Sequence, residues 1–412
     1  MADQSWTRFT GTGTAPNIGA WQSLPVVDPA AARRPSKYVA SPDLAAAVNV
    51  ALTLGMPLLL TGEPGSGKSQ LAYRLAWELG FPNPEFRALE AALQGERYSE
   101  PEFGPMKFVV KSTTEARDLF YTFDTVGRFH AAQVDAARRA AHAADPNSRA
   151  SHPPQTELEA NSGASVEAVN FIDYQALGLA ILRAKGLQKL QRLSTSREQA
   201  FLAARHGNKI SNQPVRSVVL IDEIDKAPRD VPNDILAEIE DMSFVIPELG
   251  RIEIGLDRDD QRYRPVIIIT SNSERDLPPA FLRRCVYYHV PFPPFEENPK
   301  DLSATSVIQI VRSRLGDRYT DDALREPLAL FRHLREKERD LAGKAPSIAE
   351  LLSWLEQLHH DHFADDARTP ASRLSAIAPE LLVRSVQQVL LKSKDDQQQA
   401  AQLIAGWDRS RA

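Results

Sequence analysis

The chain has 412 residues, a net charge of −5 and a single cysteine, Cys285. This length predicts two or three domains, and the acidic balance disfavours a protein that coats nucleic acid. One cysteine excludes an internal disulfide and is typical of a reducing compartment. No apolar run reaches the ~18 residues of a membrane span, and no N-terminal segment resembles a signal peptide. We therefore expect a cytoplasmic protein with no membrane contact.

The N-terminal residues differ in composition from the rest of the chain. Residues 1–40 are rich in Gly, Pro, Thr and Ala and are expected to form an arm rather than a packed domain. Ser41 then predicts the N-cap, and Pro42 the first residue, of a helix that continues to about Leu54. The apolar run at 58–60 has the composition of a buried parallel strand.

Directly after this strand, eight residues fit the pattern G-x-x-x-x-G-K-[ST]. Its glycines let backbone N–H groups surround phosphate oxygens, and the helix predicted over 70–79 directs its positive N-terminal end at them. In this pattern the lysine reaches the β- and γ-phosphates, and the serine hydroxyl binds Mg²⁺. The sequence therefore predicts a nucleotide-phosphate site made of Gly62, Glu63, Pro64, Gly65, Ser66, Gly67, Lys68 and Ser69, with Ser69 as a Mg²⁺ ligand.

The next part of the chain contains an insertion, predicted over about 125–215. A strand begins at Phe108, and the run Ser-Thr-Thr-Glu at 112–115 has the pattern of a capping box that starts a helix. Residues 131–168 are rich in Ala, Ser and Pro with little apolar periodicity, so we expect an exposed and partly disordered segment. A helix is predicted over 171–185.

The aromatic residues Phe120, Tyr121 and Phe123 precede the insertion. They either contact a client protein or belong to the core, and both interpretations stay open at this point. Farther along, residues 244–248 and 251–254 flank Leu-Gly and predict a β-hairpin.

Acidic and polar residues follow two further apolar strands. The strand at 218–221 is followed by Asp222, placed to support Mg²⁺, and by Glu223, placed to polarise an attacking water. The strand at 266–269 leads to Asn272, whose side chain can reach the γ-phosphate or that water. Adjacent arginines, Arg283 and Arg284, are either surface charge or reach a nucleotide on a neighbouring subunit.

The order of these elements predicts the fold class. Apolar strands separated by helices, with the glycine-rich loop after the first strand, indicate an α/β domain with a doubly wound parallel sheet over 41–295. After the proline cluster at 291–294 the pattern becomes helical, which predicts an all-helical lid domain over 296–412.

Four segments together resemble an AAA+ P-loop NTPase, and within that group the MoxR type with a helix-2 insert. They are TGEPGSGKS, LIDEIDKAPRDVPNDILAEIED, VIIITSNSERDLPPAFLRRC and KSTTEARDLFYTFDTVGRFHAAQ, and the resemblance covers about 38–295. It implies an ATPase that binds ATP and Mg²⁺ between the subunits of a hexameric ring. It also implies remodelling of a client protein, often with a partner that carries a von Willebrand factor A domain.

The resemblance also implies roles for single residues. Lys68 and Ser69 match Walker A, Asp222 and Glu223 match Walker B, and Asn272 matches sensor 1. Arg284 lies at the arginine-finger position, with Arg283 as the fallback. The sensor 2 role has no residue, because Ser347 stands where its arginine is expected and Lys344 is the nearest substitute.

Three other functions remain open. A P-loop kinase is disfavoured because the adjacent Asp222 and Glu223, with Asn272, favour water as the phosphoryl acceptor. A nucleotide-dependent switch or assembly scaffold with slow hydrolysis fits the same motifs. An AAA+ protein that acts on nucleic acid is disfavoured by the net charge and by the lack of a basic stripe.

Overall fold

The computed structural model describes residues 34–81, 103–144, 168–193, 209–295, 305–316, 319–337, 341–363, 374, 377–405 and 407. Most of the arm predicted over 1–40 therefore lies outside the described residues. A short 3₁₀ helix, η3 (Pro35–Lys37), precedes α1 (Pro42–Leu54). As predicted, Ser41 caps α1, with its Oγ accepting a hydrogen bond from the Leu44 N–H at 3.2 Å.

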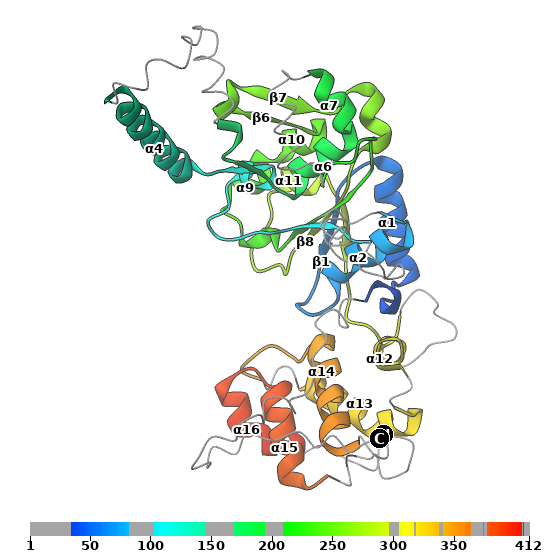
Figure 1. Ribbon diagram of the computed structural model, residues 1–412. Coiled ribbons are helices and arrows are strands. Elements are labelled where there is room, and N and C mark those ends of the chain that lie inside the picture. The colour runs from blue at the N-terminus through cyan, green and yellow to red at the C-terminus, as the bar shows by residue number, and fades with distance from the viewer. Residues whose placement is uncertain are drawn as a thin grey trace, which may run out of the picture. The chain divides into compact units, whose positions relative to one another are not determined.

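Five parallel strands form the central sheet, in the order β2-β5-β8-β1-β9 (Figure 1). Because the strands are parallel, the segments that follow β1, β5 and β8 emerge at the same edge of the sheet. The bounds of the strands are β1 (Leu58–Thr61), β2 (Met106–Val109), β5 (Val218–Asp222), β8 (Val266–Thr270) and β9 (Val286–His289).

Alternate side chains of the sheet enter two different cores. Leu59 and Ile221 belong to the core on one face, which includes α6 (Ala176–Lys185). Leu58 and Leu220 belong to the core on the other face, with α1 and α2 (Lys68–Glu78). A strand covered on both faces is apolar at every position, which explains the continuous apolar runs in the sequence. The predicted α/β parallel sheet with helices on both faces is confirmed.

The segment after β2 differs from the prediction. The expected helix at 112–115 is absent, and a 3₁₀ helix, η5 (Ala116–Leu119), begins three residues later with Glu115 as its N-cap. The Thr114 hydroxyl instead accepts a hydrogen bond from the Lys111 N–H at 2.8 Å and closes a turn. The turn that Thr114 closes occupies the residues where this helix was expected, and Glu115, the last residue of the predicted capping box, begins η5 instead.

The insertion also differs. A helix, α4 (Thr125–Ala144), occupies the first part of the segment expected to be disordered, whereas residues 145–167 lie outside the described residues. Its alanines have the highest helix propensity, and this outweighs the weak apolar periodicity. The helix predicted over 171–185 begins only at α6, because β4 (Ile172–Tyr174) pairs antiparallel with β3 (Tyr121–Phe123).

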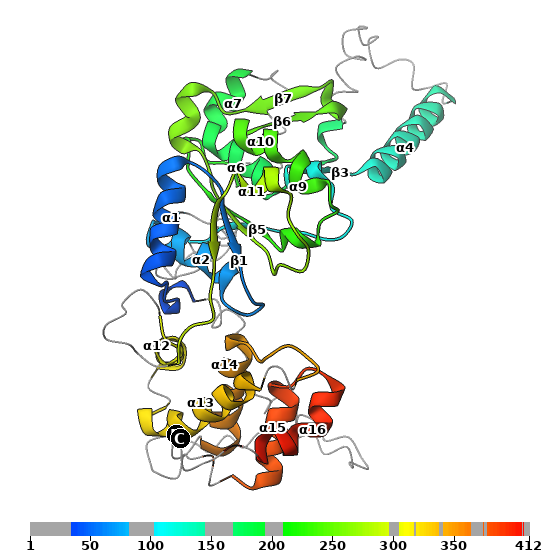
Figure 2. The same cartoon turned by 180° about the vertical axis from the view of Figure 1, so that it is seen from behind.

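The predicted hairpin is confirmed as β6 (Ser243–Ile246) and β7 (Ile252–Gly255), joined through η8 (Pro247–Leu249). Figures 1 and 2 show it beside α6 and α10 (Leu236–Asp241). Phe244 of the hairpin stacks on Phe120, with ring centroids 5.3 Å apart. Phe120 and Tyr121 are buried in the core, so the core interpretation holds for both.

The remaining short elements connect the strands. They are α7 (Leu187–Leu193), η7 (Ile224–Lys226), α9 (Val231–Asp234), η9 (Arg258–Tyr263) and α11 (Pro279–Leu282).

The described residues after the proline cluster are mainly helical, and they have a core of their own around Trp354 and Phe331. None of the helices within the described ranges is both long and apolar enough to cross a membrane. The C-terminal elements are α12 (Val307–Leu315), α13 (Asp321–Glu336), α14 (Ile348–Leu358), the π-helix η12 (His359–Phe363), α15 (Pro379–Val389) and α16 (Lys394–Ala405).

Candidate nucleotide-binding site

Three glycines of the loop between β1 and α2 have positive φ, namely Gly62, Gly65 and Gly67. Gly62 has φ 137°, and a Cβ there would lie 2.6 Å from the carbonyl oxygen of Val290. Gly67 has φ 87° and forms the N-cap of α2. Both conformations are unfavourable for other residues, so the glycines of the pattern are required by the backbone itself. The loop thereby leads directly into the N-terminus of α2, the end of a helix that favours anions.

Lys68 is buried at the base of this loop, with only 6% of its surface exposed. Its ammonium group donates hydrogen bonds to the carbonyl oxygens of Gly62 and Glu63, both at 2.8 Å. Burial lowers the pKa of Lys68, and the nearby carboxylates of Asp225 and Asp222 act in the opposite direction. The loop therefore holds its cation next to its own backbone, where a bound phosphate would also lie.

Two serines of the loop are placed for an anion and its metal. The Ser66 hydroxyl is shielded from solvent and has no hydrogen-bond partner within the part of the chain that the structure describes. Buried hydroxyls are normally paired, so this one is available to a ligand. The Ser69 hydroxyl donates to Oδ1 of Asp222 at 2.6 Å. A hydroxyl and a carboxylate are oxygen groups that Mg²⁺ accepts, either directly or through its bound water.

Asp222 receives donors from three other elements. Besides Ser69 from α2, the Thr270 hydroxyl from β8 donates to Oδ1 at 2.7 Å. The Lys107 ammonium from β2 lies 2.6 Å from Oδ2. Burial by itself raises the pKa of Asp222, but the hydrogen bonds from Lys107, Ser69 and Thr270 outweigh it and hold that pKa below its usual value. Asp222 is therefore ionised and fixed in orientation.

Glu223 has a left-handed backbone, with φ 63° and ψ 50°. Such a conformation is uncommon for a non-glycine residue and is typical of constrained functional positions. Its N–H donates to the Thr270 hydroxyl at 3.0 Å, and the Asn272 amide lies 3.5 Å from Oε1. Lys226 pairs with Oε2 at 2.7 Å. The structure thus brings Glu223 and Asn272 together, close to Asp222.

Asp225 was not singled out from the sequence, yet it organises the segment after β8. Its buried carboxylate accepts hydrogen bonds from the backbone N–H of Asn272 at 3.2 Å and of Glu274 at 3.1 Å. These bonds fix the backbone that carries the Asn272 side chain. The sequence does show an acidic residue three positions after Asp222. The residues around it, however, do not distinguish a buried acid from an exposed acid in a turn.

We expect Asp225→Ala to lower the free energy of unfolding by about 2–4 kcal/mol, because the backbone N–H groups of Asn272 and Glu274 lose their charged acceptor. Urea denaturation measures this loss, and Asp230→Ala, at an exposed acid of the same segment, is the matched control. Equal stability of the two variants would show that Asp225 does not hold the segment.

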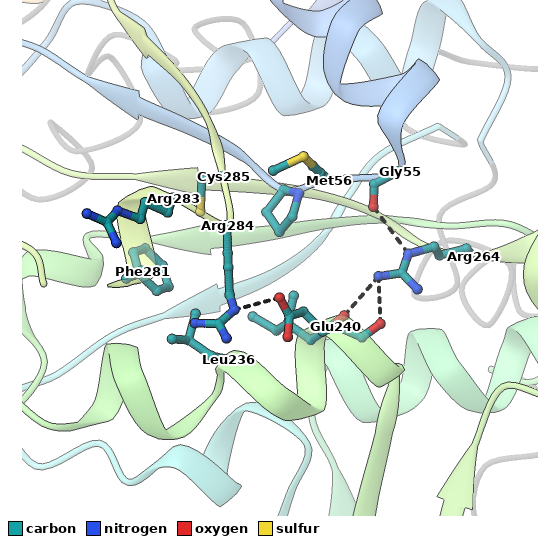
Figure 3. Close-up of a pocket in the computed structure, with 11 residues that line it drawn as sticks. Gly55, Met56, Leu236, Glu240, Arg264, Phe281, Arg283, Arg284 and Cys285 are labelled. Carbon is teal, nitrogen blue, oxygen red and sulfur yellow. Dashed lines mark hydrogen bonds and ion pairs between the residues drawn. The ribbon is translucent and has the colours of Figure 1, made fainter. Parts of the chain in front are cut away.

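Arg283 and Arg284 lie at the amino-terminal ends of the strands, whereas the residues described so far lie at the carboxyl ends. Both residues precede β9, and the Val286 N–H that starts this strand donates to the carbonyl of Pro57, just before β1. The loop at 62–69 follows the other end of β1. Arg284 forms an ion pair with Glu240 at 2.5 Å, and both residues line a cavity of about 210 Å³. Figure 3 shows Arg283 pointing away from Glu240. The structure therefore separates the arginines from the loop of the same chain.

Cys285 lines the same cavity and is 9% exposed. Burial raises the pKa of its thiol to about 12, so the neighbouring arginine does not produce a thiolate. We expect a disulfide reagent to leave Cys285 unmodified in the folded protein at mildly alkaline pH, and to modify it completely in guanidinium chloride. Rapid modification of the folded protein would contradict this assignment.

A C-terminal arginine, also missed from the sequence, contacts the loop at 62–69. Arg335 of α13 donates to both carboxylate oxygens of Glu63 at 3.1 Å, and its guanidinium lies 3.5 Å from the ring centroid of Phe292. Ser347, at the position expected for the sensor 2 arginine, is the N-cap of α14, and its hydroxyl lies against Gly65. Lys344 is exposed.

Comparison with known proteins adds no family: no family model matches the chain, and no similar curated protein is found. Within the described ranges there is also no group of three or more His, Cys, Asp or Glu side chains suited to a metal ion. A cation at Ser69 and Asp222 would therefore take its other ligands from phosphate oxygens and water, which is how Mg²⁺ is commonly held beside nucleotides.

Proposed function

We propose that this protein is an ATP hydrolase of the AAA+ MoxR type. The supporting observation is the grouping at one sheet edge of a buried Lys68, the Ser69–Asp222 pair and the Glu223–Asn272 pair. Lys68 and the loop N–H groups would bind the phosphates of ATP, and Ser69 with Asp222 would hold Mg²⁺. Bound Mg²⁺ neutralises charge on the transferred phosphoryl group.

Glu223 is the residue proposed to orient and deprotonate the attacking water, with Asn272 positioning that water or the γ-phosphate. Arg284 would complete the site of a neighbouring subunit, because it lies at the edge of the sheet away from its own loop. We infer a ring-shaped homo-oligomer, hexameric by the resemblance, with the C-terminal helices as the lid. Its work would be to remodel a client protein in the cytoplasm, with a von Willebrand factor A-domain protein as a candidate partner.

The solution mass of Glu223→Gln, measured by light scattering with and without Mg-ATP, tests this proposal. The variant should bind ATP and stall before hydrolysis, because it lacks the carboxylate that activates water. We expect a shift from the monomer mass of 45.7 kDa to about six subunits. A monomer under both conditions, together with absent phosphate release by the unmodified protein, would overturn the proposal.

One observation favours a second function, a nucleotide switch or scaffold with slow hydrolysis. Lys226 pairs with Glu223 at 2.7 Å, and this ion pair engages the carboxylate that would otherwise contact the attacking water. Assembly with Mg-ATP but without measurable phosphate release would support this alternative.

A further inference from the structure

Asp222 already has a cation beside it. The Lys107 ammonium lies 2.6 Å from Oδ2, whereas Oδ1 accepts hydrogen bonds from the Ser69 and Thr270 hydroxyls. The side chains of Lys107 and Asp222 are 32% and 10% exposed, so the lysine covers the more open side of a largely buried carboxylate. Oδ2 is also the oxygen that remains for the water shell of a metal ion at Ser69.

The strand register explains why this lysine reaches the site. Lys107 pairs with Leu220 in the parallel β2–β5 ladder, and Asp222 lies two residues beyond Leu220 on the same face. That face carries α2, and therefore Ser69. Met106 and Phe108, on either side of Lys107, pack into the core of the opposite face. The backbone of β2 thus directs one charged side chain to the phosphate side of the sheet.

We propose that Lys107 is a positioning residue that serves as a built-in counter-cation of Asp222 and sets how strongly nucleotide binding depends on Mg²⁺. This inference rests on the proposed function. An ammonium group at this point attracts nucleotide phosphates when no metal is present. It also repels a divalent cation that approaches the same carboxylate, and the two charges compete for Oδ2. The two effects both reduce the gain in nucleotide affinity that Mg²⁺ provides.

The test is the ratio of two dissociation constants for a fluorescent, non-hydrolysable ATP analogue, measured in EDTA and in Mg²⁺. Lys107→Met removes the charge and keeps most of the apolar stem. We expect it to raise the EDTA-to-Mg²⁺ ratio about tenfold, equivalent to about 1.4 kcal/mol. Lys107→Arg keeps the charge and should keep the ratio of the unmodified protein. Lys111→Met, at an exposed lysine four residues away, is the matched control.

A purely structural role would weaken binding equally in both conditions and leave the ratio unchanged, and that result would overturn the inference. A ratio that rises equally for Arg and Met at position 107 would overturn it as well. If Lys107→Met does not fold by circular dichroism, Lys107→Gln removes the same charge and carries the same expectation. Failure of the unmodified protein to bind the analogue in either condition would overturn the proposed function, whereas normal binding with an unchanged ratio overturns this inference alone.

Discussion

Lys68→Ala is expected to abolish nucleotide binding, with an affinity loss of at least about 100-fold. Hydrogen bonds to charged groups contribute about 1.5–3 kcal/mol each, and the Lys68 ammonium is placed to make two of them to the β- and γ-phosphates. Its present partners, the carbonyl oxygens of Gly62 and Glu63, show that the side chain spans the loop. The carboxylates of Asp222, Glu223 and Asp225 would then repel the phosphates without this cation.

Titration with a fluorescent ATP analogue in the presence of Mg²⁺ measures the loss. Lys111→Ala, at an exposed lysine outside the loop, is the control and should bind as the unmodified protein does. The variant should remain folded, because the ammonium group is buried at a cost that its removal relieves. Unchanged affinity in a folded Lys68→Ala protein would mean that the phosphate site is elsewhere.

The parts of the site that follow local backbone rules were predictable from the sequence. Gly62 and Gly67 are demanded by positive φ, and the strands β1, β5 and β8 are continuously apolar because helices cover both of their faces. Parallel strands then bring Asp222 and Asn272 to the edge where the loop begins. Each of these predictions needs only a local sequence pattern and the rule that the carboxyl ends of parallel strands lie at the same edge of a sheet.

The contacts that were missed depend on pairing between distant segments. Lys107 reaches Asp222 only through the β2–β5 register, and Arg335 reaches Glu63 across 272 positions of the chain. β9 was also missed, because half of its residues are exposed at the sheet edge and its tyrosines give no continuous apolar run. In α4, composition suggested disorder although alanine favours helix. Local sequence patterns therefore missed contacts between distant segments, and composition underestimated the helix propensity of α4.

A mixing experiment tests whether Arg284 acts on a neighbouring subunit. Arg284→Ala should bind ATP normally but hydrolyse it about 10³-fold more slowly or worse, the effect typical of a missing arginine finger. The Glu240–Arg284 pair holds the guanidinium at the surface of the chain, with both side chains about half exposed. Such a pair contributes about 0–1 kcal/mol, so Arg284 can leave Glu240 for a phosphate at little cost. Arg283→Ala removes the adjacent exposed arginine and is the matched control.

Neither Arg284→Ala nor Glu223→Gln should hydrolyse ATP alone, but their mixture should recover part of the rate. In a head-to-tail ring mixed in equal amounts, about a quarter of the interfaces join an intact Glu223 to an intact Arg284 from the next subunit. If the arginine acted within its own chain, every subunit would keep one defect and the mixture would stay inactive. An inactive mixture would leave action in trans unsupported for Arg284. If Arg283→Ala hydrolyses ATP slowly while Arg284→Ala stays active, the arginine-finger role belongs to Arg283. The two residues leave the same short turn in different directions, so only one of them is expected to reach the neighbouring site.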